Sequence, residues 1–167
     1  MRVCILICCA VLLLFGCASG KDEYVVPNTT QIQEPITDLG PEAAMKRVEA
    51  ATRYLLQYVA EVGKFPDAQT GHDLKRLLRE HYGDKVQAFG GEDDLTGFES
   101  VWIRNDGKGP LLYNYGLTGK TPDEIANKET MWLLQDPVQF PEVGSIFSYV
   151  SGKVETVKRL PAAAGTG

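Results

Sequence analysis

Cysteine is nearly absent from this chain of 167 residues. Three of its four cysteines, Cys4, Cys8 and Cys9, lie in the first nine positions, and the fourth is Cys17. If the segment before Cys17 is removed and Cys17 carries a thioether, no thiol is left for a disulfide, a redox pair or a cysteine metal site. Packing alone must then stabilise the fold, and about 150 residues are enough for one domain with its own core.

Hydrophobic runs long enough to cross a membrane are also missing from the N-terminal region. Its apolar run, Val3–Phe15, has 13 residues, whereas a transmembrane helix needs roughly 20. Arg2 precedes the run, and Leu14-Phe15-Gly16-Cys17 closes it. This order is typical of a bacterial lipobox, so we predict a lipoprotein signal peptide over 1–16 and lipidation of Cys17.

The anchor predicted at Cys17 is a stable one, because each buried CH₂ contributes about 0.8 kcal/mol and two or more acyl chains hold firmly. Two other interpretations stay open: a secretory signal cut near Ala10 or Ala18, and an uncleaved short anchor. Ala18 is not the aspartate that retains lipoproteins at the inner membrane. We therefore expect the periplasmic face of an outer membrane, within the cell envelope.

Groups for catalysis are scarce. The chain has two histidines, His72 and His81, and a spacing of nine on one helix puts them on different sides, so they cannot ligate one metal together. A Gly-x-Ser-x-Gly elbow and a phosphate-binding P-loop are both absent from the sequence. A glycosidase pair of carboxylates needs only to meet in space, but so small a domain lacks a long cleft-forming insertion. We predict a non-enzyme without a cofactor.

Positive charge is in deficit. The formal net charge is −5, from 17 basic and 22 acidic residues, and loss of Arg2 with the signal leaves 16 against 22, or −6. An acidic surface argues against a nucleic-acid partner and against a polybasic membrane patch.

Oxygen-rich loops are the remaining candidates for a metal. Glu92, Asp93 and Asp94 lie among glycines, and Asn105-Asp106-Gly107 is a second such run. Calcium takes six to eight oxygen ligands, and neither run has the Asp-x-Asp-x-Asp-Gly pattern. We predict solvated loops and no metal site, with Glu92, Asp93 and Asp94 as weak calcium candidates.

The chain divides into a tether, a domain and a tail. Residues 17–40 are polar and interrupted by Pro27 and Pro35, so we expect a flexible tether that lets the domain stand tens of ångströms off the bilayer. The domain is expected over 41–160, and the small-residue tail 161–167 is expected to fray.

Helical periodicity starts at Pro41. Apolar residues recur every three or four positions up to Val62, and Gly63 suits a left-handed cap, so we predict a long amphipathic helix over 41–62. Thr70-Gly71-His72-Asp73 resembles a capping box and predicts a second helix that ends at Gly83. Thr121–Glu124 predicts one or two further helical turns.

The second half of the chain has β character, with tight-turn signals at Asn105-Asp106-Gly107 and at Ser151-Gly152. We predict an α+β fold in which the long helix packs on an antiparallel sheet of about four strands. The candidate strands are Ser100–Arg104, Leu111–Tyr115, Thr130–Gln135, Ser145–Val150 and Lys153–Lys158.

Three segments are similar to the major pseudopilins of type II secretion and to the wider pilin-like class. Gly63-Lys64-Phe65-Pro66, followed by Gly71, resembles the Gly-Arg-Tyr-Pro…Gly segment that ends the pseudopilin helix. Gly109–Tyr115 resembles the Asp-Pro-Trp-Gly…Tyr-x-Tyr stretch, and Ser145–Val154 resembles the terminal Val-Leu-Phe-Ala-Asp-Gly-His-Val hairpin. The resemblance spans Pro41–Lys158 with gaps and implies a pilin-like globular domain.

The departures from that class bear on function. The hydrophobic assembly helix and its Gly-Phe-Thr-Leu-x-Glu processing signature are missing, and the lipid anchor stands in their place. In the last hairpin the Asp-Gly pair is Ser151-Gly152, the following His is Lys153, and the upstream His is Pro141. The resemblance therefore implies a pseudopilin-like domain on a lipoprotein and does not imply a filament subunit.

The strand aromatics are the main candidates for partner binding. Most should be core residues, but an aromatic group that faces outward would mark a protein contact, and Trp102, Tyr113 and Tyr115 are our candidates. We expect a lipid-anchored scaffold that binds an envelope protein, and the resemblance suggests an accessory of type II secretion or type IV pilus-type machinery. The alternatives are a small-ligand or calcium-dependent binding lipoprotein, with a concave pocket, and an envelope hydrolase, with titratable groups converging in a cleft.

Overall fold

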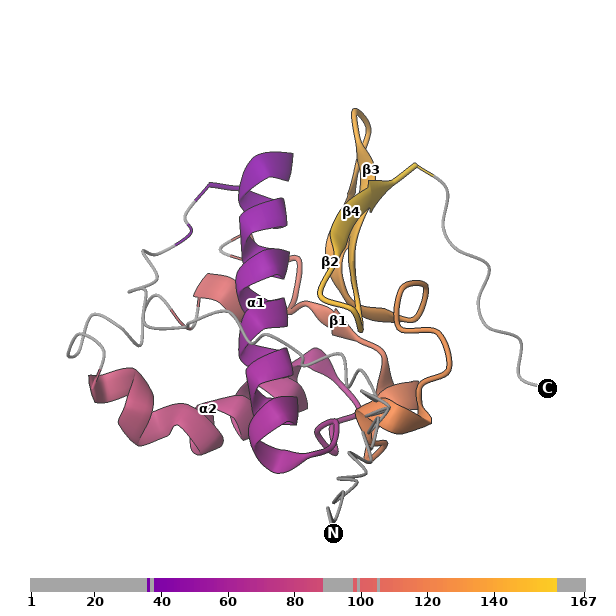
Figure 1. Ribbon diagram of the computed structural model, residues 1–167. Helices are drawn as coiled ribbons and strands as arrows, with labels where there is room; N and C mark the ends of the chain where they lie inside the picture. Colours follow the sequence, from indigo (N-terminus) through magenta and orange to yellow (C-terminus); the bar gives the residue numbers. More distant parts are fainter. Residues whose placement is uncertain (1–35, 37, 89–97, 99, 105, 159–167) are drawn as a thin grey trace, which may run out of the picture.

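Figure 1 shows the computed structural model, which describes residues 36, 38–88, 98, 100–104 and 106–158. The predicted signal peptide, Cys17, the tether up to residue 35, the calcium candidates Glu92, Asp93 and Asp94 and the tail 161–167 lie outside these residues. The elements in chain order are α1 (Pro41–Val62), α2 (Gly71–Ala88), β1 (Leu112–Tyr113), the 3₁₀ turns η1 (Tyr115–Leu117) and η2 (Pro122–Glu124), β2 (Trp132–Phe140), β3 (Gly144–Tyr149) and β4 (Val154–Val157).

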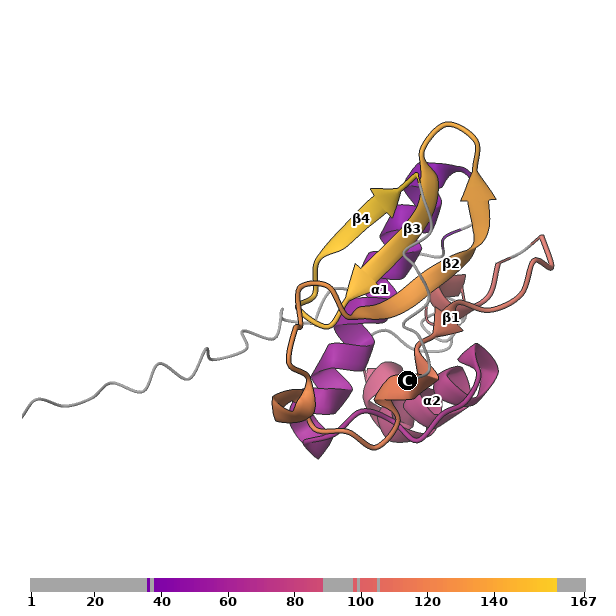
Figure 2. The ribbon, with the colours of Figure 1, turned by 90° about the vertical axis from the view of Figure 1, so that its right-hand side faces the viewer.

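The four strands form one antiparallel sheet in the order β1-β2-β3-β4. The predicted α+β class and the four-stranded antiparallel sheet are therefore confirmed. Helix α1 lies along one face of this sheet and contacts β2, β3 and β4, while α2 lies across the lower end of α1 and reaches β1 (Figures 1 and 2). Among the described residues, no helix is both long and apolar enough to span a bilayer.

Helix α1 is buried on most of its sides. Pro41 occupies the first turn, where the missing N–H has no cost, and Glu42 lies there as well, favoured by the helix dipole. Gly63 ends the helix with φ 83°, and its N–H donates to the carbonyl of Val59, which is the left-handed cap that the sequence predicts. Because its buried stripe is wide, α1 is the central element of the core.

Helix α2 starts at the predicted capping residues. The Asp73 N–H donates to Thr70 Oγ1 at 3.1 Å, and the Thr70 hydroxyl donates to Asp73 Oδ2 at 2.7 Å. The predicted end at Gly83 is wrong, because the helix continues to Ala88. A glycine inside a helix costs only about 1 kcal/mol relative to alanine, so the hydrogen bonds on either side of Gly83 can carry the helix through it.

The predicted strand Ser100–Arg104 is also wrong. Residues 100–102 are helical, and only Ile103 pairs with another extended residue, in a single bridge to Pro110. Trp102 accounts for the difference, since its side chain is fully buried in the core cluster beside Phe98, with their rings 6.0 Å apart. Here the burial of two aromatic side chains outweighs the local β propensity of the segment.

The remaining strands occur where the sequence predicts them, with shifted ends. Strand β1 is two residues long, because Asn114 leaves the strand to start η1, its side chain accepting a hydrogen bond from the Gly116 N–H. Strand β2 extends five residues beyond the predicted end at Gln135, to Phe140. The turn at Ser151-Gly152 joins β3 to β4, with Gly152 at φ 88°, as predicted.

The two faces of the sheet carry different side chains, and α1 covers one of the faces. Along β3, Ile146 belongs to the core cluster under α1, and so does Val150 just beyond the strand. Phe147 and Tyr149 alternate with them, so their side chains point to the other face, and neither belongs to that cluster. We call this second face the outer sheet face; its residues are Leu112, Trp132, Gln135, Phe147 and Tyr149.

Candidate binding surface

Two of the three predicted partner-binding aromatics are buried. Trp102 has none of its surface exposed and Tyr113 has 4 %. The Tyr113 hydroxyl donates to the carbonyl of Pro66 at 3.4 Å, and burial raises its pKa. Both side chains fill the core, so their prediction as partner contacts is wrong. Tyr115 is 69 % exposed, and its assignment stays a prediction that the structure permits.

Tyr115 lies close in sequence to a second exposed apolar residue. Leu112, in β1, is 44 % exposed, and among the described residues the other large apolar side chains with similar exposure are Leu39 and Val62. Leu112 pairs with Gln135, which in turn pairs with Phe147. Because paired residues point to the same face of a sheet, Leu112 extends the outer sheet face to the β1 edge.

Three other residues of the outer sheet face, Trp132, Phe147 and Tyr149, are aromatic. The Trp132 and Phe147 rings meet edge to face, with centroids 6.4 Å apart and planes at 83°, which is a favourable geometry. Lys153 Nζ lies 5.8 Å from the centre of the Tyr149 ring, and burial raises the pKa of Tyr149 to about 12, with Glu155 contributing to the shift. Figure 2 looks toward the sheet with α1 behind it.

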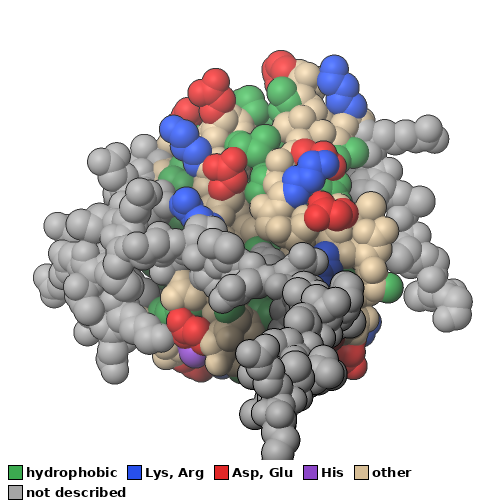
Figure 3. Space-filling view, in the orientation of Figure 1, with side chains coloured by type: hydrophobic (Ala, Val, Ile, Leu, Met, Phe, Trp, Pro, Cys, Tyr) green, Lys and Arg blue, Asp and Glu red, His purple; other side chains and the backbone are tan. Residues whose placement is uncertain are grey.

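A groove opens beside the C-terminal half of α1. Its volume is about 450 Å³. Apolar side chains of Leu56, Val59, Phe65 and Val150 form its floor, and Pro122, Asp123, Lys128, Glu129 and Ser151 are among the residues at its rim. Figure 3 shows the face of the molecule that is seen in Figure 1, where apolar side chains lie between charged groups of both signs.

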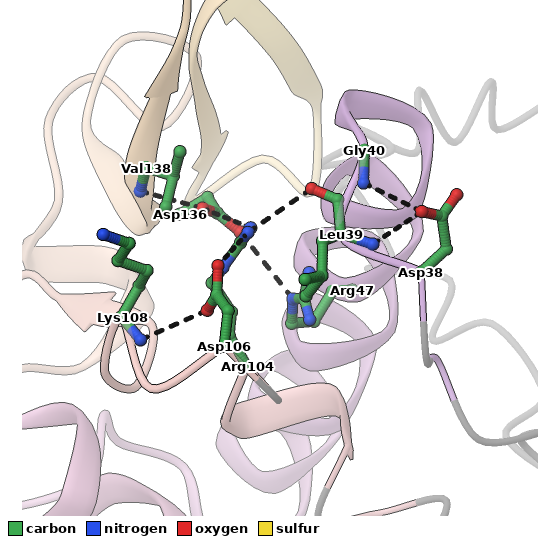
Figure 4. A network of polar contacts seen from close by, with 9 residues as sticks. All are labelled: Asp38, Leu39, Gly40, Arg47, Arg104, Asp106, Lys108, Asp136 and Val138. Atoms are coloured by element: carbon green, nitrogen blue, oxygen red, sulfur yellow. Dashed lines mark hydrogen bonds and ion pairs between the residues drawn. The ribbon is translucent and has the colours of Figure 1, made fainter.

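A polar network connects the start of the domain to its middle (Figure 4). Arg104 donates two hydrogen bonds to the carboxylate of Asp106, from Nε at 3.0 Å and from Nη2 at 2.8 Å. Its Nη1 donates to Asp136 Oδ1 at 3.4 Å. Its Nη2 also donates to the Leu39 carbonyl at 3.3 Å. The hydrogen bonds from Arg104 lower the pKa of Asp106 to about 2, and the bond to Asp106 raises the pKa of Arg104.

Arg47 is the buried member of this network. Its side chain is fully buried on α1, and Nε lies 3.7 Å from Asp136 Oδ2, whose side chain is also fully buried. Among the residues that the structure describes, the three guanidinium nitrogens of Arg47 and this carboxylate oxygen have no hydrogen-bond partner. Burial lowers the pKa of Arg47, and the neighbouring Asp136 partly offsets this shift.

The two histidines lie in different surroundings. His81 Nε2 lies 2.7 Å from Glu61 Oε2, and the His81 ring packs edge to face on Tyr58 and Tyr82, so His81 connects α2 to α1. His72 is exposed on the first turn of α2. Within the described part of the chain, no three histidine, cysteine or acidic side chains come together as a metal site would require.

Sequence reasoning missed the groove and the network, for different reasons. The groove is assembled from α1, the segment after it, η2, residues 128–129 and the β3–β4 turn, and no periodicity predicts such a meeting. Arg47 did carry a signal: it follows Ala43 and Ala44 and precedes Ala51 on the buried side of α1, and a charge within an apolar stripe requires a buried partner.

Comparison with known proteins adds no assignment to this surface. No protein-family model, no curated protein and no solved structure matches this chain.

Proposed function

We propose that this protein is a lipid-anchored component of the bacterial cell envelope, attached through Cys17, and that its domain binds another protein as a non-enzymatic scaffold. The anchor is supported by the order of Arg2, the apolar run and the lipobox. The binding role is supported by the surface, because Leu112 exposes apolar area at the β1 edge of the outer sheet face, and Tyr115, three residues further on in η1, is also exposed.

The exposure of Tyr115 is the observation that carries the binding role. A tyrosine supplies a large, rigid contact area at low entropic cost, and tyrosine is enriched among the residues that dominate interface energies. An edge strand as short as β1 presents few free backbone groups, so nonspecific strand pairing is disfavoured there. We therefore place the partner contact on side chains, at Leu112 and Tyr115.

The arrangement of α1 on the antiparallel sheet supports a finer proposal, in which the domain is pilin-like. A long helix followed by a sheet that ends in a hairpin is the order implied by the resemblance to the major pseudopilins. On that basis the partner belongs to type II secretion or type IV pilus-type machinery, and the outer-membrane periplasmic face is the expected location. The domain would act there as an accessory that docks on a filament or channel subunit.

The anchor is tested by metabolic palmitate labelling of the wild type and of Cys17→Ser. We expect label in the wild type and none in Cys17→Ser, because acylation requires the thiol. The control is Cys9→Ser, which lies within the predicted signal peptide and should keep the label. Equal labelling of Cys17→Ser and the wild type would exclude Cys17 as the site, and an unlabelled wild type would mean that the domain is not acylated.

The binding role is tested in the same cells by a photo-crosslinking amino acid at position 115 or, as the control, at Lys46, an exposed position on α1. We expect a discrete protein adduct from position 115 that is reduced at least tenfold by Leu112→Ser, and no such adduct from position 46. The adduct from position 115 should contain a secretion or pilus component. A pattern that is the same at both positions would overturn the assignment of this surface.

A further inference from the structure

The groove beside α1 has the construction of a binding site for an apolar group. Leu56, Val59, Phe65 and Val150 are each at most 6 % exposed, and their remaining surface is the apolar floor of the groove. A volume of about 450 Å³ lies within the range of about 300–1,000 Å³ that is usual for ligand pockets. The exposed Ala60 lets a ligand approach α1 closely, because its side chain is a single methyl group.

Hydrogen bonds outside the groove fix its walls. The Phe65 N–H donates to the Lys120 carbonyl at 2.8 Å, and the Gly119 N–H donates to the Phe65 carbonyl at 3.2 Å, which holds the segment before η2 against the end of α1. On the opposite side, the Ser151 N–H donates to the Lys128 carbonyl at 3.0 Å. The groove is therefore formed by backbone that is already paired, and a ligand need not order it.

The rim of the groove has a negative balance. Asp123 and Glu129 are exposed acids at the rim, and Lys128 is the one basic residue that lines the groove among the described residues. The last turn of α1, which includes Ala60, carries no basic side chain, and the partial negative charge at a helix C-terminus adds to the negative balance. A positive charge beside the apolar group would therefore be attracted to this rim.

We propose that the groove binds a segment of a protein partner that inserts an apolar side chain over the floor and places a lysine or arginine against Asp123 and Glu129. This inference goes beyond the proposed function and is independent of it: the groove requires neither the acyl chains at Cys17 nor a contact at Tyr115.

The test uses methyl NMR of the full-length chain in detergent micelles, titrated with the capped peptide acetyl-Lys-Leu-Lys-amide. The matched probe is acetyl-Glu-Leu-Glu-amide, which has the same apolar side chain and the opposite charge. We expect the methyl signals of Leu56, Val59 and Val150 to shift with the basic peptide, at a millimolar Kd. The acidic peptide should bind about fivefold more weakly, because exposed charge pairs are weak.

Three variants make the result specific. Ala60→Met fills the groove from a helical position that tolerates methionine, and it should abolish the shifts. Lys46→Met, at an exposed position elsewhere on α1, should leave them unchanged. Asp123→Asn combined with Glu129→Gln should remove the preference for the basic peptide while leaving residual binding to the apolar floor.

The proposal is overturned if neither peptide shifts these methyl signals, or if Ala60→Met leaves the shifts intact. Equal binding of both peptides would overturn the proposed contact of a lysine or arginine with Asp123 and Glu129. If an uncharged apolar probe such as toluene binds more strongly than either peptide, the groove is a small-molecule site instead. Because crosslinking at position 115 tests the other surface, failure of the groove and failure of the proposed function give different results.

Discussion

Two glycines of α2 differ sharply in what a side chain would meet. A Cβ atom at Gly71 would overlap the carbonyl oxygen of Leu111 and lie 3.1 Å from Pro110 Cβ, whereas at Gly83 it would have nothing within 4 Å. Gly71 therefore allows the start of α2 to approach the backbone that leads into β1. Gly83 has no such role and only weakens its helix.

Alanine at these two positions should have opposite effects on stability. We expect Gly71→Ala to lower the free energy of unfolding by about 3 kcal/mol, because backbone must move to relieve the overlap. Gly83→Ala should raise it by about 0.5–1 kcal/mol through helix propensity. Urea unfolding followed by circular dichroism measures both. A Gly71→Ala variant as stable as the wild type would show that α2 does not lie against Leu111 as described.

Asp106 contributes to the dependence of the stability of the fold on pH in the acid range. Its pKa falls from the ordinary 3.8 to about 2, chiefly because Arg104 donates hydrogen bonds to its carboxylate. A carboxyl whose pKa is lower in the folded state stabilises the fold above its unfolded pKa and loses that contribution as the pH falls through the folded value. We expect the urea midpoint to decline between about pH 4 and pH 2.

Asp106→Asn should flatten part of that decline, since asparagine does not titrate. Asp123→Asn, at an exposed position on η2, is the control and should leave the pH profile as it is in the wild type. If Asp106→Asn and the wild type lose stability in parallel over this range, the bond to Arg104 does not form in solution.

The contact between α1 and β2 depends on a buried ion pair whose two members are not equivalent. Asp136 faces both Arg47 and Arg104 and accepts a hydrogen bond from the Val138 N–H at 2.9 Å. If Asp136 is removed, Arg47 keeps a charge that is fully buried and has no carboxylate beside it. If Arg47 is removed, Asp136 still has Arg104.

We therefore expect Asp136→Ala to cost about 3–5 kcal/mol and Arg47→Met less than about 1.5 kcal/mol. In the double variant, Arg47→Met should recover part of the loss, because it removes the stranded charge. The free energies of unfolding of the wild type, the two single variants and the double variant form a double-mutant cycle. Equal costs for the two single variants would contradict the asymmetry of the network.

Local signals predicted the elements whose ends are determined by local chemistry. The Gly63 cap, the Thr70–Asp73 start of α2 and the Ser151-Gly152 turn are present as expected, because each depends on residues that are neighbours in sequence. Strand β2 was predicted too short, because its far end pairs with Ser145 and Gly144 of β3. That register is a property of two strands together.

The site was less predictable than the fold, because exposure is decided by tertiary packing. Composition alone does not distinguish Trp102, which is buried, from Tyr115, which is exposed. The segment around Trp102 has alternating β-like character, yet the ring contact with Phe98 holds it in a helical turn. Of the three aromatic residues predicted to contact a partner, Tyr115, two residues beyond β1, is the exposed one.

At the scale of the whole molecule, the residues just before α1 are part of the folded domain. Ile36 is 8 % exposed and belongs to the core cluster, and its N–H donates to Ser100 Oγ at 3.0 Å. Asp38 accepts hydrogen bonds from the N–H groups of Leu39 and Gly40. Ile36 and residues 38–40, which composition assigns to the tether 17–40, thus belong to the folded domain.

Ile36→Ala should lower the free energy of unfolding by about 2–3 kcal/mol, the usual range for a buried aliphatic side chain. Leu39→Ala, only three residues away but with 39 % of its side chain exposed, should cost less than about 1 kcal/mol. Thermal unfolding of the full chain measures both. Similar losses at the two positions would mean that the folded domain begins at Pro41, as the sequence predicts.

The bond between Ile36 and Ser100 spans 64 residues, and this separation has a consequence for biogenesis. At about 5–20 residues per second, a ribosome needs roughly 3–13 s to make the second partner after the first. During that interval Ile36 and the side of α1 that faces the sheet have no partner surface, although α2 is already made. If the chain is exported from its N-terminus, as we propose, it passes through the same order, so Ile36 waits for Ser100 and is available to a chaperone or a protease in the meantime.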